Sequence, residues 1–306
     1  MESTIEVNLL DSLIKNSHLI PTGVKGVYGK GKYMQLLLTN LENYLCNIGR
    51  TESTEIMTFP PVMNKESIEV KDYVKSFPHL LGTVNSFFGG NSEYKGLMKS
   101  VEEGKEWTDH YSKTEVVMTP AACYPVYPSL SGTLNEGGRV VEVSSFCFRH
   151  EPSDEPTRMI SFKMLEYVFA GTPAEVTVWR EKWIEKAKGI LKELKLDFNM
   201  VVADDPFFGK GGKLLKLNQK QLELKYELVV PVNSVEKPTA VISSNYHQDL
   251  FSKKHHILTH GNEHAHTSCL AFGLERLAIA LMKNHGMAFS EWPESVVKLL
   301  NLDLKS

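Results

Sequence analysis

The chain has 306 residues, of which 42% are hydrophobic and 23% are charged, as is usual for a soluble globular protein with a sizeable core. Its formal net charge of −3 argues against a general polyanion-binding protein, because wide phosphate contact needs a basic surface. The four cysteines form no CxxC pair, so we expect a reducing, cytoplasmic setting. The first residues are acidic and no apolar run approaches roughly 20 residues, so we expect neither a signal peptide nor a membrane span.

Residues 1–55 are predicted to be mainly helical, because hydrophobic residues recur there at the spacing of one helical face. The residues on this face are Met34, Leu37, Leu38, Leu41 and Leu45. Before this helix, residues 23–31 hold a Gly-x-x-Gly-x-Gly pattern. No strand precedes the pattern, so we interpret it as a loop and not as a dinucleotide-binding turn.

Two segments in the first half of the chain, residues 56–62 and 115–128, each predict an apolar strand that ends in prolines. Residues 180–196 predict an amphipathic helix that packs on a core, because one face is hydrophobic and the other carries lysines and glutamates. Residues 209–213 are rich in Gly and Lys but lack the spacing and the Ser/Thr of a phosphate-binding loop. We interpret them as a solvated turn.

Further strands follow one another with few β-α-β alternations, which favours an antiparallel sheet flanked by helices. We therefore predict an α+β fold in which residues 1–306 form one domain. The remaining predicted elements are strands at 198–203, 222–232 and 238–244, a helix at 273–285 that begins at Gly273, and a short helix after Trp292-Pro293.

Three arginines lie where they could hold a phosphate chain. Arg149 ends a strand that we expect to be buried, Arg158 follows a polar loop, and Arg276 lies in the first turn of an apolar helix. An arginine chosen at random is more often part of a surface ion pair, but these positions do not suit a surface charge. Arginine also supplies the fixed charge and the forked donors that phosphate requires, so we favour nucleotide binding.

Glu151 and Phe162 flank the same polar loop. Glu151 lies two residues after Arg149, so on an extended strand the two side chains point to one face. Phe162 could stack on a nucleotide base, although a lone aromatic residue more often belongs to a core.

Cys123, Glu166 and Cys269 form a candidate metal-ligand set. Two thiolates and a carboxylate can hold zinc and leave a fourth coordination position open, as catalytic zinc sites do. The three residues are far apart in the sequence, so their spacing does not show that they converge. From the residues alone, the more ordinary interpretation of both cysteines is that of small buried side chains.

Six of the eleven histidines fall within residues 247–266, and a metal cluster is one interpretation of them. Their spacings match no metal-binding motif, and the segment is rich in Lys, Asn and Gly, so we favour a mobile, partly exposed loop. The six are His247, His255, His256, His260, His264 and His266.

Residues 146–166 and 272–277 resemble motifs 2 and 3 of class II aminoacyl-tRNA synthetases. The resemblance extends in one order over about residues 110–300 and is most specific to seryl-tRNA synthetases. The further similar segments are Phe162-Lys-Met-Leu-Glu166, residues 225–231, Ser243-Ser-Asn245 with the residues up to 249, His266-Thr267 and Gly273-Leu-Glu-Arg276.

The chain departs from seryl-tRNA synthetases in two respects. It shows no sustained heptads for the coiled-coil arm that grips tRNA, and Val241 stands where those enzymes carry a carboxylate near the metal-bound phosphates. Amino acid:[carrier protein] ligases, which resemble the core of the zinc-using seryl-tRNA synthetases and lack the arm, look like this chain over most of its length. The segments that carry this resemblance are 120–125, 148–153, 171–173, 205–209, 245–249 and 266–269.

The resemblance implies a set of site residues. One Zn²⁺ per subunit would be bound by Cys123, Glu166 and Cys269. Glu166, Asn245 and Cys269 would contact the amino acid, and Glu227 would replace the carboxylate missing at Val241. ATP with Mg²⁺ would be bound by Arg149, Glu151, Arg158, Phe162, Glu227 and Arg276, of which Arg149 and Arg276 would be catalytic.

The implied reaction is activation of glycine or alanine to the aminoacyl-adenylate, followed by transfer to the phosphopantetheine thiol of a small carrier protein. A pocket separates hydrogen from methyl poorly, so we expect both amino acids to be used. We also expect a homodimer, no membrane partner and no tRNA. Because an acidic carrier favours basic contacts, the histidine-rich segment and the turn with Lys210, Lys213 and Lys216 are candidate docking surfaces.

Three alternatives remain open at this point. The chain could be a seryl-tRNA synthetase or a paralogue that acts on tRNA, which tRNA-dependent activity would reveal. It could be a non-catalytic binding module with the same fold, although such a module would have no need of the arginines and the metal-ligand set. It could also pass the activated amino acid to a small molecule, which only an acceptor assay would separate from carrier loading.

Overall fold

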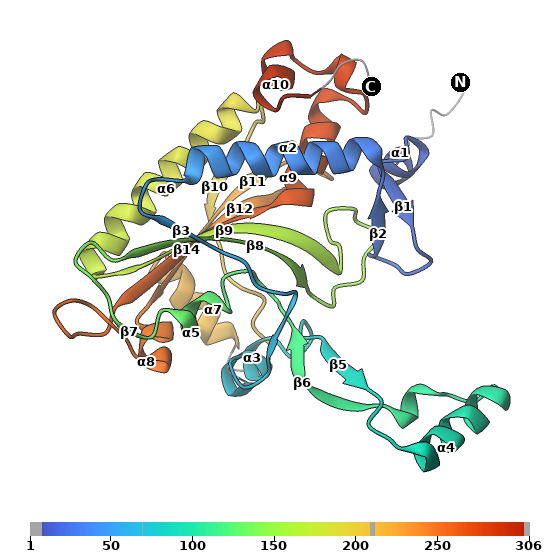
Figure 1. Ribbon diagram of the computed structural model, residues 1–306. Coiled ribbons are helices and arrows are strands. Elements are labelled where there is room, and N and C mark those ends of the chain that lie inside the picture. Colours follow the sequence, from blue (N-terminus) through green and yellow to red (C-terminus); the bar gives the residue numbers. More distant parts are fainter. Residues whose placement is uncertain (1–7, 69, 209–211, 303–306) are drawn as a thin grey trace, which may run out of the picture.

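A sheet of seven strands lies at the centre of the computed structural model, which describes residues 8–68, 70–208 and 212–302 (Figure 1). Its strands are β3 (Thr54–Met57), β8 (Arg139–Phe148), β9 (Ser161–Gly171), β10 (Asn199–Val202), β11 (Lys225–Val230), β12 (Thr239–Gln248) and β14 (His266–Gly273). Their order is β10-β11-β12-β14-β9-β8-β3, and every neighbouring pair is antiparallel except β3 and β8. The predicted α+β fold with a mainly antiparallel sheet is therefore confirmed.

The two faces of the sheet carry different side chains, because successive residues of a strand point to opposite faces. On one face, Leu165 and Tyr167 of β9 and Phe272 of β14 are fully buried in the main hydrophobic core. The alternate residues, such as Glu166 and Cys269, point to the other face. The first face packs into the main core. The second face buries a smaller hydrophobic cluster that includes Val143 and Val168, and the polar residues of the site lie beside it.

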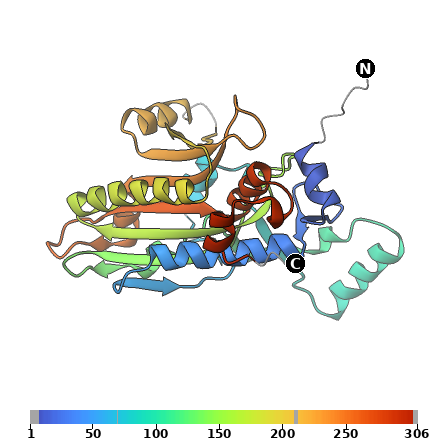
Figure 2. The same ribbon diagram turned by 90° about the horizontal axis from the view of Figure 1, so that it is seen from above.

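Helices cover the first face, which holds the main core, as Figures 1 and 2 show. Leu37 and Leu41 of α2 (Lys32–Gly49) are fully buried there, and Trp183 of α6 (Pro173–Glu193) stacks on Tyr167 with ring centroids 4.4 Å apart. The helix face predicted between Met34 and Leu45 is therefore confirmed, since all five of its residues are buried. The other helices on this side are α1 (Leu9–Lys15), α9 (Leu274–His285) and α10 (Glu294–Leu299).

The α6 helix begins at Pro173 and not at residue 180 as predicted. Thr172 is its N-cap: the Thr172 Oγ1 atom accepts from the Glu175 N–H, and the Glu175 carboxylate accepts from the Thr172 N–H at 2.7 Å. This capping box and the proline at the first helical position supply the start signal. The prediction missed the first two turns because the hydrophobic stripe is weak there.

The N-terminal region is helical, as predicted, but it also contains a hairpin of β1 (Leu19–Pro21) and β2 (Tyr28–Lys30). The glycine pattern predicted to be a loop lies around its turn, where Gly23 and Gly26 have φ of 85° and 78°. Such positive φ values favour glycine, so the pattern serves backbone geometry.

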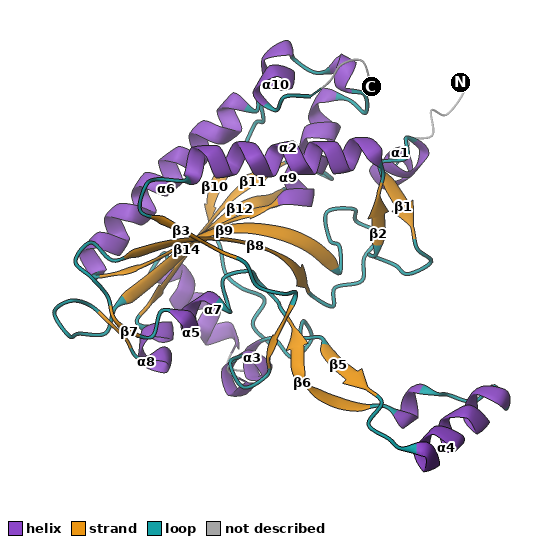
Figure 3. Cartoon of the chain, in the orientation of Figure 1, coloured by secondary structure: helices purple, strands orange, loops and turns teal. Residues whose placement is uncertain are grey.

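A second, three-stranded sheet has the order β4-β6-β5 and carries an extension that projects from the molecule (Figure 3). Its strands are β4 (Val62–Asn64), β5 (Thr83–Ser86) and β6 (Ser112–Met118), and the extension holds α4 (Asn91–Glu102) and η1 (Thr108–His110). The strands predicted at 56–62 and 115–128 correspond to β3 and β6, which end before their prolines.

The remaining elements lie around the second face of the large sheet or near its ends, except η2, whose Phe289 packs into the main core beside α2. They are α3 (Val70–Ser76), α5 (Val126–Ser129), β7 (Gly132–Thr133), α7 (Gly212–Gln221), α8 (Leu250–His255), β13 (Ile257–Leu258) and η2 (Phe289–Glu291). Residues 209–211 of the predicted Gly/Lys turn lie outside the described residues, and residues 212–213 begin α7. Within the described part of the chain, none of the helices has the length and hydrophobicity needed to cross a membrane.

Candidate active site

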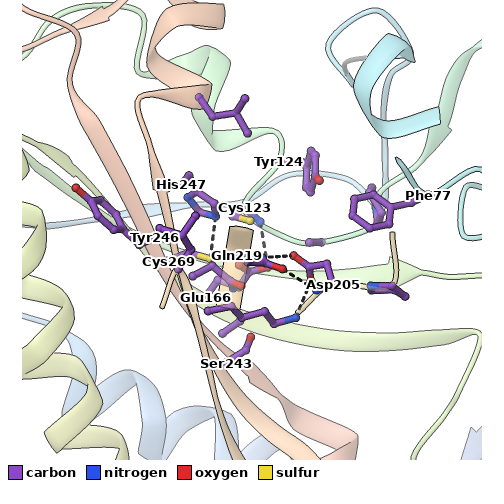
Figure 4. Close-up of a pocket in the computed structure, with 18 of the residues that line it drawn as sticks. Phe77, Cys123, Tyr124, Glu166, Asp205, Gln219, Ser243, Tyr246, His247 and Cys269 are labelled. Atoms are coloured by element: carbon purple, nitrogen blue, oxygen red, sulfur yellow. Dashed lines mark hydrogen bonds and ion pairs between the residues drawn. The ribbon is translucent and has the colours of Figure 1, made fainter. Parts of the chain in front are cut away.

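A cavity of about 820 Å³ lies on the second face of the large sheet, and Figure 4 shows side chains that line it. Strand pairing decides which side chains meet there. Glu227 of β11 lies opposite Ser243 of β12, and Asn245 of β12 lies opposite Cys269 of β14. Directly opposed residues of antiparallel strands share a face, so the register gathers side chains from distant segments. The volume is within the range of small-molecule sites.

Cys123, Glu166 and Cys269 meet in the wall of this cavity (Figure 4). All three residues are buried, and a sulfur or carboxylate oxygen of each lies within 4.8 Å of the others. Cys123 comes from the segment between β6 and α5, and its backbone N–H donates to Glu166 Oε1 at 3.2 Å. The three side chains therefore converge, which their sequence spacing did not show. Two thiol groups and a carboxyl group are donors that zinc prefers, so this set fits a zinc ion.

The pKa values of the three candidate ligands are strongly shifted. Burial raises the pKa of Glu166 to about 8, and the negative charge of the neighbouring Cys269 sulfur adds to this effect. A hydrogen bond between the two sulfur atoms lowers the pKa of Cys269 and raises that of Cys123, whose thiol is also buried. A divalent cation that bound here would therefore release protons from Cys123 and Glu166.

Arg149 lies directly after β8 and lines the cavity, as predicted from the end of its strand. Its Nε atom donates to the Pro120 carbonyl at 2.9 Å, and its guanidinium carbon lies 5.5 Å from the centroid of the Phe162 ring. Burial opposes its charge, but the charges that nearby acidic groups carry when ionised, Tyr73 first, leave its pKa raised. The side chain is thus a fixed positive charge within the cavity.

Arg276 lies in the first turn of α9, behind its N-cap Gly273, and also lines the cavity. Its Nε and Nη1 atoms donate to the carbonyls of Thr157 and Ala240, each at 3.0 Å. Burial, together with repulsion from Arg149 and Arg158, lowers its pKa to about 10. The clustered arginines repel one another, so an anion that bound between them would relieve this repulsion.

Glu151 and Arg158 are not among the residues that line the cavity. The Arg158 side chain is 50% exposed and pairs with Glu155 at 3.1 Å and with Glu151 at 4.0 Å. The two predicted nucleotide contacts therefore lie outside the cavity wall, and their roles stay predictions.

An ion-pair network that the sequence did not indicate lies in the same cavity. Lys225 Nζ is 2.6 Å from Asp205 Oδ1 and 3.1 Å from Glu227 Oε1, the candidate Mg²⁺ ligand. Burial opposes the Asp205 charge, but Lys225 keeps the Asp205 pKa below its ordinary value. Gln219 of α7 exchanges two hydrogen bonds of 2.8 Å with Asp205, so α7 is tied to the cavity wall.

The histidine-rich segment is not one mobile loop, contrary to the prediction. His247 lies on β12, His255 ends α8 and His266 begins β14. Among the described residues, the only group of His, Cys, Asp or Glu side chains close enough to hold a metal ion together is Cys123, Glu166 and Cys269. The histidines are dispersed because β12 and α8 separate them.

The comparisons with known proteins identify the family. No family model matches the chain. Amino acid–[acyl-carrier-protein] ligase 2 of Bradyrhizobium diazoefficiens is 41% identical over 282 residues, which are 92% of this chain and 84% of that protein. Ligase 1 of the same organism is also 41% identical, over 92% of this chain and 86% of its own length. The chain belongs to the amino acid–[acyl-carrier-protein] ligase family.

This ligase is also related to synthetases of the seryl class. A type-2 serine–tRNA ligase of Methanopyrus kandleri is 27% identical over 201 residues, 60% of this chain and 38% of that protein. The crystal structure of M. kandleri SerRS with A. aeolicus tRNASec has a TM-score of 0.80 at 20% identity, over 96% of this chain and 60% of that one. The crystal structure of Pyrococcus horikoshii seryl-tRNA synthetase with ATP has a TM-score of 0.69 at 14% identity. The match covers 97% of this chain and 63% of that one. The class II synthetase-like fold of the ligase is therefore confirmed.

Proposed function

We propose that this protein uses ATP to activate glycine or alanine and transfers the amino acid to the phosphopantetheine thiol of a carrier protein. The observation that carries the proposal is one cavity in which the Cys123–Glu166–Cys269 cluster lies together with Arg149 and Arg276. The cluster suits an amino group and the arginines suit phosphates, and an aminoacyl-adenylate carries both. The names of the two Bradyrhizobium relatives support the same reaction.

In the first step, a carboxylate oxygen of the amino acid attacks the α-phosphorus of ATP and pyrophosphate leaves. Arg149 holds the α-phosphate and the attacking carboxylate, and Arg276 holds the γ-phosphate. In support, the Pro120 carbonyl binds Arg149 through Nε and so orients the guanidinium, whose Nη2 atom otherwise contacts only the Met164 sulfur at 4.0 Å among the described residues. Arg276 is likewise fixed through Nε and Nη1. Rate acceleration then comes from positioning and from charge stabilisation.

The other ATP contacts follow from the resemblance. Phe162 stacks on adenine, Glu151 accepts from the adenine amino group, Arg158 contacts a phosphate and Glu227 binds Mg²⁺. The positions of Phe162 and Glu227 in the cavity support their part of the proposal. Glu227 would exchange its present partner Lys225 for the cation, leaving Lys225 paired with Asp205.

Cys123, Glu166 and Cys269 would hold one Zn²⁺. When bound, this ion supplies a Lewis-acid position for the α-amino group of the amino acid. Asn245 lies beside it, because its Nδ2 atom donates to Cys269 Sγ at 3.5 Å. The burial of all three ligand residues keeps the site away from bulk water and strengthens its electrostatic interactions.

In the second step, the phosphopantetheine sulfur attacks the acyl carbon of the adenylate. The bond from this carbon to the phosphate oxygen breaks, AMP leaves with the electron pair, and the thiol proton passes to solvent. The product is an aminoacyl thioester on the carrier. The chain itself supplies the walls that keep the adenylate from hydrolysis before the thiol arrives.

The deciding experiment is amino-acid-dependent exchange of pyrophosphate into ATP, with a panel of amino acids, before and after zinc is removed by a chelator. We expect zinc-dependent exchange with glycine or alanine, followed by thioester formation on a phosphopantetheinylated carrier. Exchange with serine and charging of tRNA would favour a synthetase instead. Folded, zinc-loaded protein that exchanges with no amino acid would point to a non-catalytic module. Exchange without thioester formation would indicate a small-molecule acceptor.

A further inference from the structure

The proposed function gives no role to His247, although its imidazole lies next to the metal-ligand cluster. It lies on β12 at a β-bulge: Tyr246 pairs with Ser268 and Gln248 with the next residue, Thr267, so β12 carries one extra residue there. Gln248 has a φ of 53°, in the left-handed region. Bulges near functional sites often redirect a side chain, and here the extra residue is the histidine.

The His247 ring points at a metal ligand (Figure 4). Its Nε2 atom lies 3.9 Å from Cys269 Sγ, within reach of a hydrogen bond to sulfur. Asn245 Nδ2 approaches the same sulfur at 3.5 Å, from two residues earlier on β12. Cys269 therefore has two nitrogen atoms facing its sulfur, one from Asn245 and one from His247.

Two hydroxyl groups on the opposite side of the ring are compatible with a tautomer that donates toward the sulfur. Nδ1 lies 3.4 Å from the Tyr127 hydroxyl and 3.3 Å from Thr267 Oγ1, and either hydroxyl can donate to it. A neutral ring with its hydrogen on Nε2 satisfies both sides, because Nδ1 then accepts and Nε2 donates. The reverse tautomer would place a lone pair on Nε2 against the electron-rich sulfur.

Aromatic side chains hold the ring in this orientation. Tyr127 and Phe251 stack with centroids 3.9 Å apart, and His247 packs edge-on against both, at 5.6 and 4.9 Å. Tyr127 is fully buried, so it is a rigid support. The ring is thus clamped by packing, by two hydroxyl groups and by the bulge, all of which direct Nε2 toward Cys269.

We propose that His247 is a positioning residue of the metal centre, which donates an Nε2–H hydrogen bond to the Cys269 sulfur and does not itself bind the metal. The inference rests on the proposed metal site. Such a donor withdraws electron density from the thiolate and fixes the direction in which its lone pairs point. Partners that orient metal ligands in this way typically contribute about 10–100-fold to metal affinity.

The test replaces zinc with Co²⁺ and compares wild type, His247→Ala and His247→Gln, because the glutamine amide can still donate toward the sulfur. His266→Ala is the matched control: His266 lies on the neighbouring strand, but its ring pairs with Tyr246, which points away from the cluster in Figure 4. Each protein is checked for folding by circular dichroism. The readouts are the sulfur-to-cobalt charge-transfer band, the visible d–d bands and the affinity for Zn²⁺.

We expect His247→Ala to move the charge-transfer band to longer wavelength and to weaken Zn²⁺ binding about 10–100-fold, with d–d bands that still report the same coordination number. His247→Gln should restore most of both properties, and His266→Ala should match wild type. An unchanged band and affinity in folded His247→Ala would overturn the inference while leaving the metal site intact. If the d–d bands of His247→Ala showed that the cobalt ion had lost a ligand, the positioning role would be overturned and His247 would be a direct metal ligand. Wild-type protein that binds neither metal would instead refute the proposed site, and the inference with it.

Discussion

Arg149 is the side chain on which adenylate formation should depend most, because it is a fixed charge held by the Pro120 carbonyl inside the cavity. Arg149→Ala is expected to lower kcat/KM for pyrophosphate exchange by about 100–1,000-fold, as for the loss of one preorganised charge donor. The measurement is the exchange assay with wild type and variant. Arg139→Ala is the control, since Arg139 lies at the other end of β8 and pairs with Glu55 of β3. This variant should change the rate less than about twofold. An Arg149 variant with normal turnover would remove this residue from the site.

Glu166 should make the stability of metal-free protein depend on pH. Its pKa is raised from 4.5 to about 8 by burial, so between these values the unfolded carboxyl is ionised while the folded one is still protonated. The contribution of Glu166 to the free energy of unfolding is therefore fully present below pH 4.5. It is lost as the pH rises to about 8, and the loss is roughly 5 kcal/mol at most. Urea unfolding at pH 5 and pH 8 measures this, and Glu166→Gln should remove most of the difference. Equal pH dependence of the two proteins would contradict the shift.

Added Zn²⁺ should stabilise wild type more at pH 8 than at pH 5, because the metal must displace protons from Glu166 and Cys123. Cys269→Ala should abolish this metal-dependent stabilisation and amino acid activation while leaving the fold largely intact. Circular dichroism and thermal unfolding with and without zinc measure the effect. Normal zinc-free activity would refute the role of zinc.

Some of these residues could be found in the sequence and others could not. Arg149 and Arg276 were predictable because the end of a strand and the first turn of a helix are local features. The convergence of Cys123, Glu166 and Cys269 depends on strand register and a connecting segment, so only the family resemblance indicated it. The sequence predicts a loop at His247, since a β-bulge that turns one side chain has no local sequence signature.

The α7 helix connects a candidate docking surface with the cavity. Its Leu215 and Gln219 line the cavity, whereas Leu214 and Leu217 are 72% and 56% exposed. Lys213 lies beside the exposed leucines, among the lysines that we expect an acidic carrier to contact. An amphipathic surface of this kind, next to the cavity, suits a partner that must deliver a thiol to it.

Lys213→Glu combined with Leu217→Ser is expected to raise KM for the carrier about tenfold and to leave pyrophosphate exchange within about twofold, because adenylate formation needs no carrier. The paired assays are thioester formation and exchange. The control is Lys182→Glu with Val178→Ser, equivalent changes at exposed positions of α6 on the other side of the sheet. If both double variants behave alike in the transfer assay, α7 is not the docking surface.

The sequence predicts the helices and strands in which hydrophobic residues recur at regular spacing. It misses the elements that lack such a pattern. The α2 helix and the strands β11 and β12 were predictable because their apolar residues recur regularly. The α7 helix was missed because its leucines are largely exposed and form no buried stripe. The start of α6 was readable in Thr172-Pro173 and Glu175, a capping signal independent of hydrophobicity.

For the whole molecule, the predicted homodimer has a specific candidate interface beside α2. Ile56 of the edge strand β3 pairs opposite Glu142 of β8, and Phe146 lies four residues further along β8, so both side chains point to the helical face of the sheet. They are 59% and 49% exposed. An edge strand with exposed apolar neighbours is a surface that proteins normally cover, and a second copy of the chain can cover it symmetrically.

We therefore expect wild type to be a dimer by light scattering at micromolar concentration, and Ile56→Asp with Phe146→Asp to shift it to monomer, since each subunit would bury two charges at a symmetric contact. Val235→Asp, at a position 79% exposed, is the control and should stay dimeric. A wild-type protein that is monomeric at all concentrations tested would refute the dimer. A double variant that stays dimeric would place the interface elsewhere. Because β3 and β8 share the sheet whose other face carries the cavity, pyrophosphate exchange of the monomer would further show whether one subunit suffices to assemble the site.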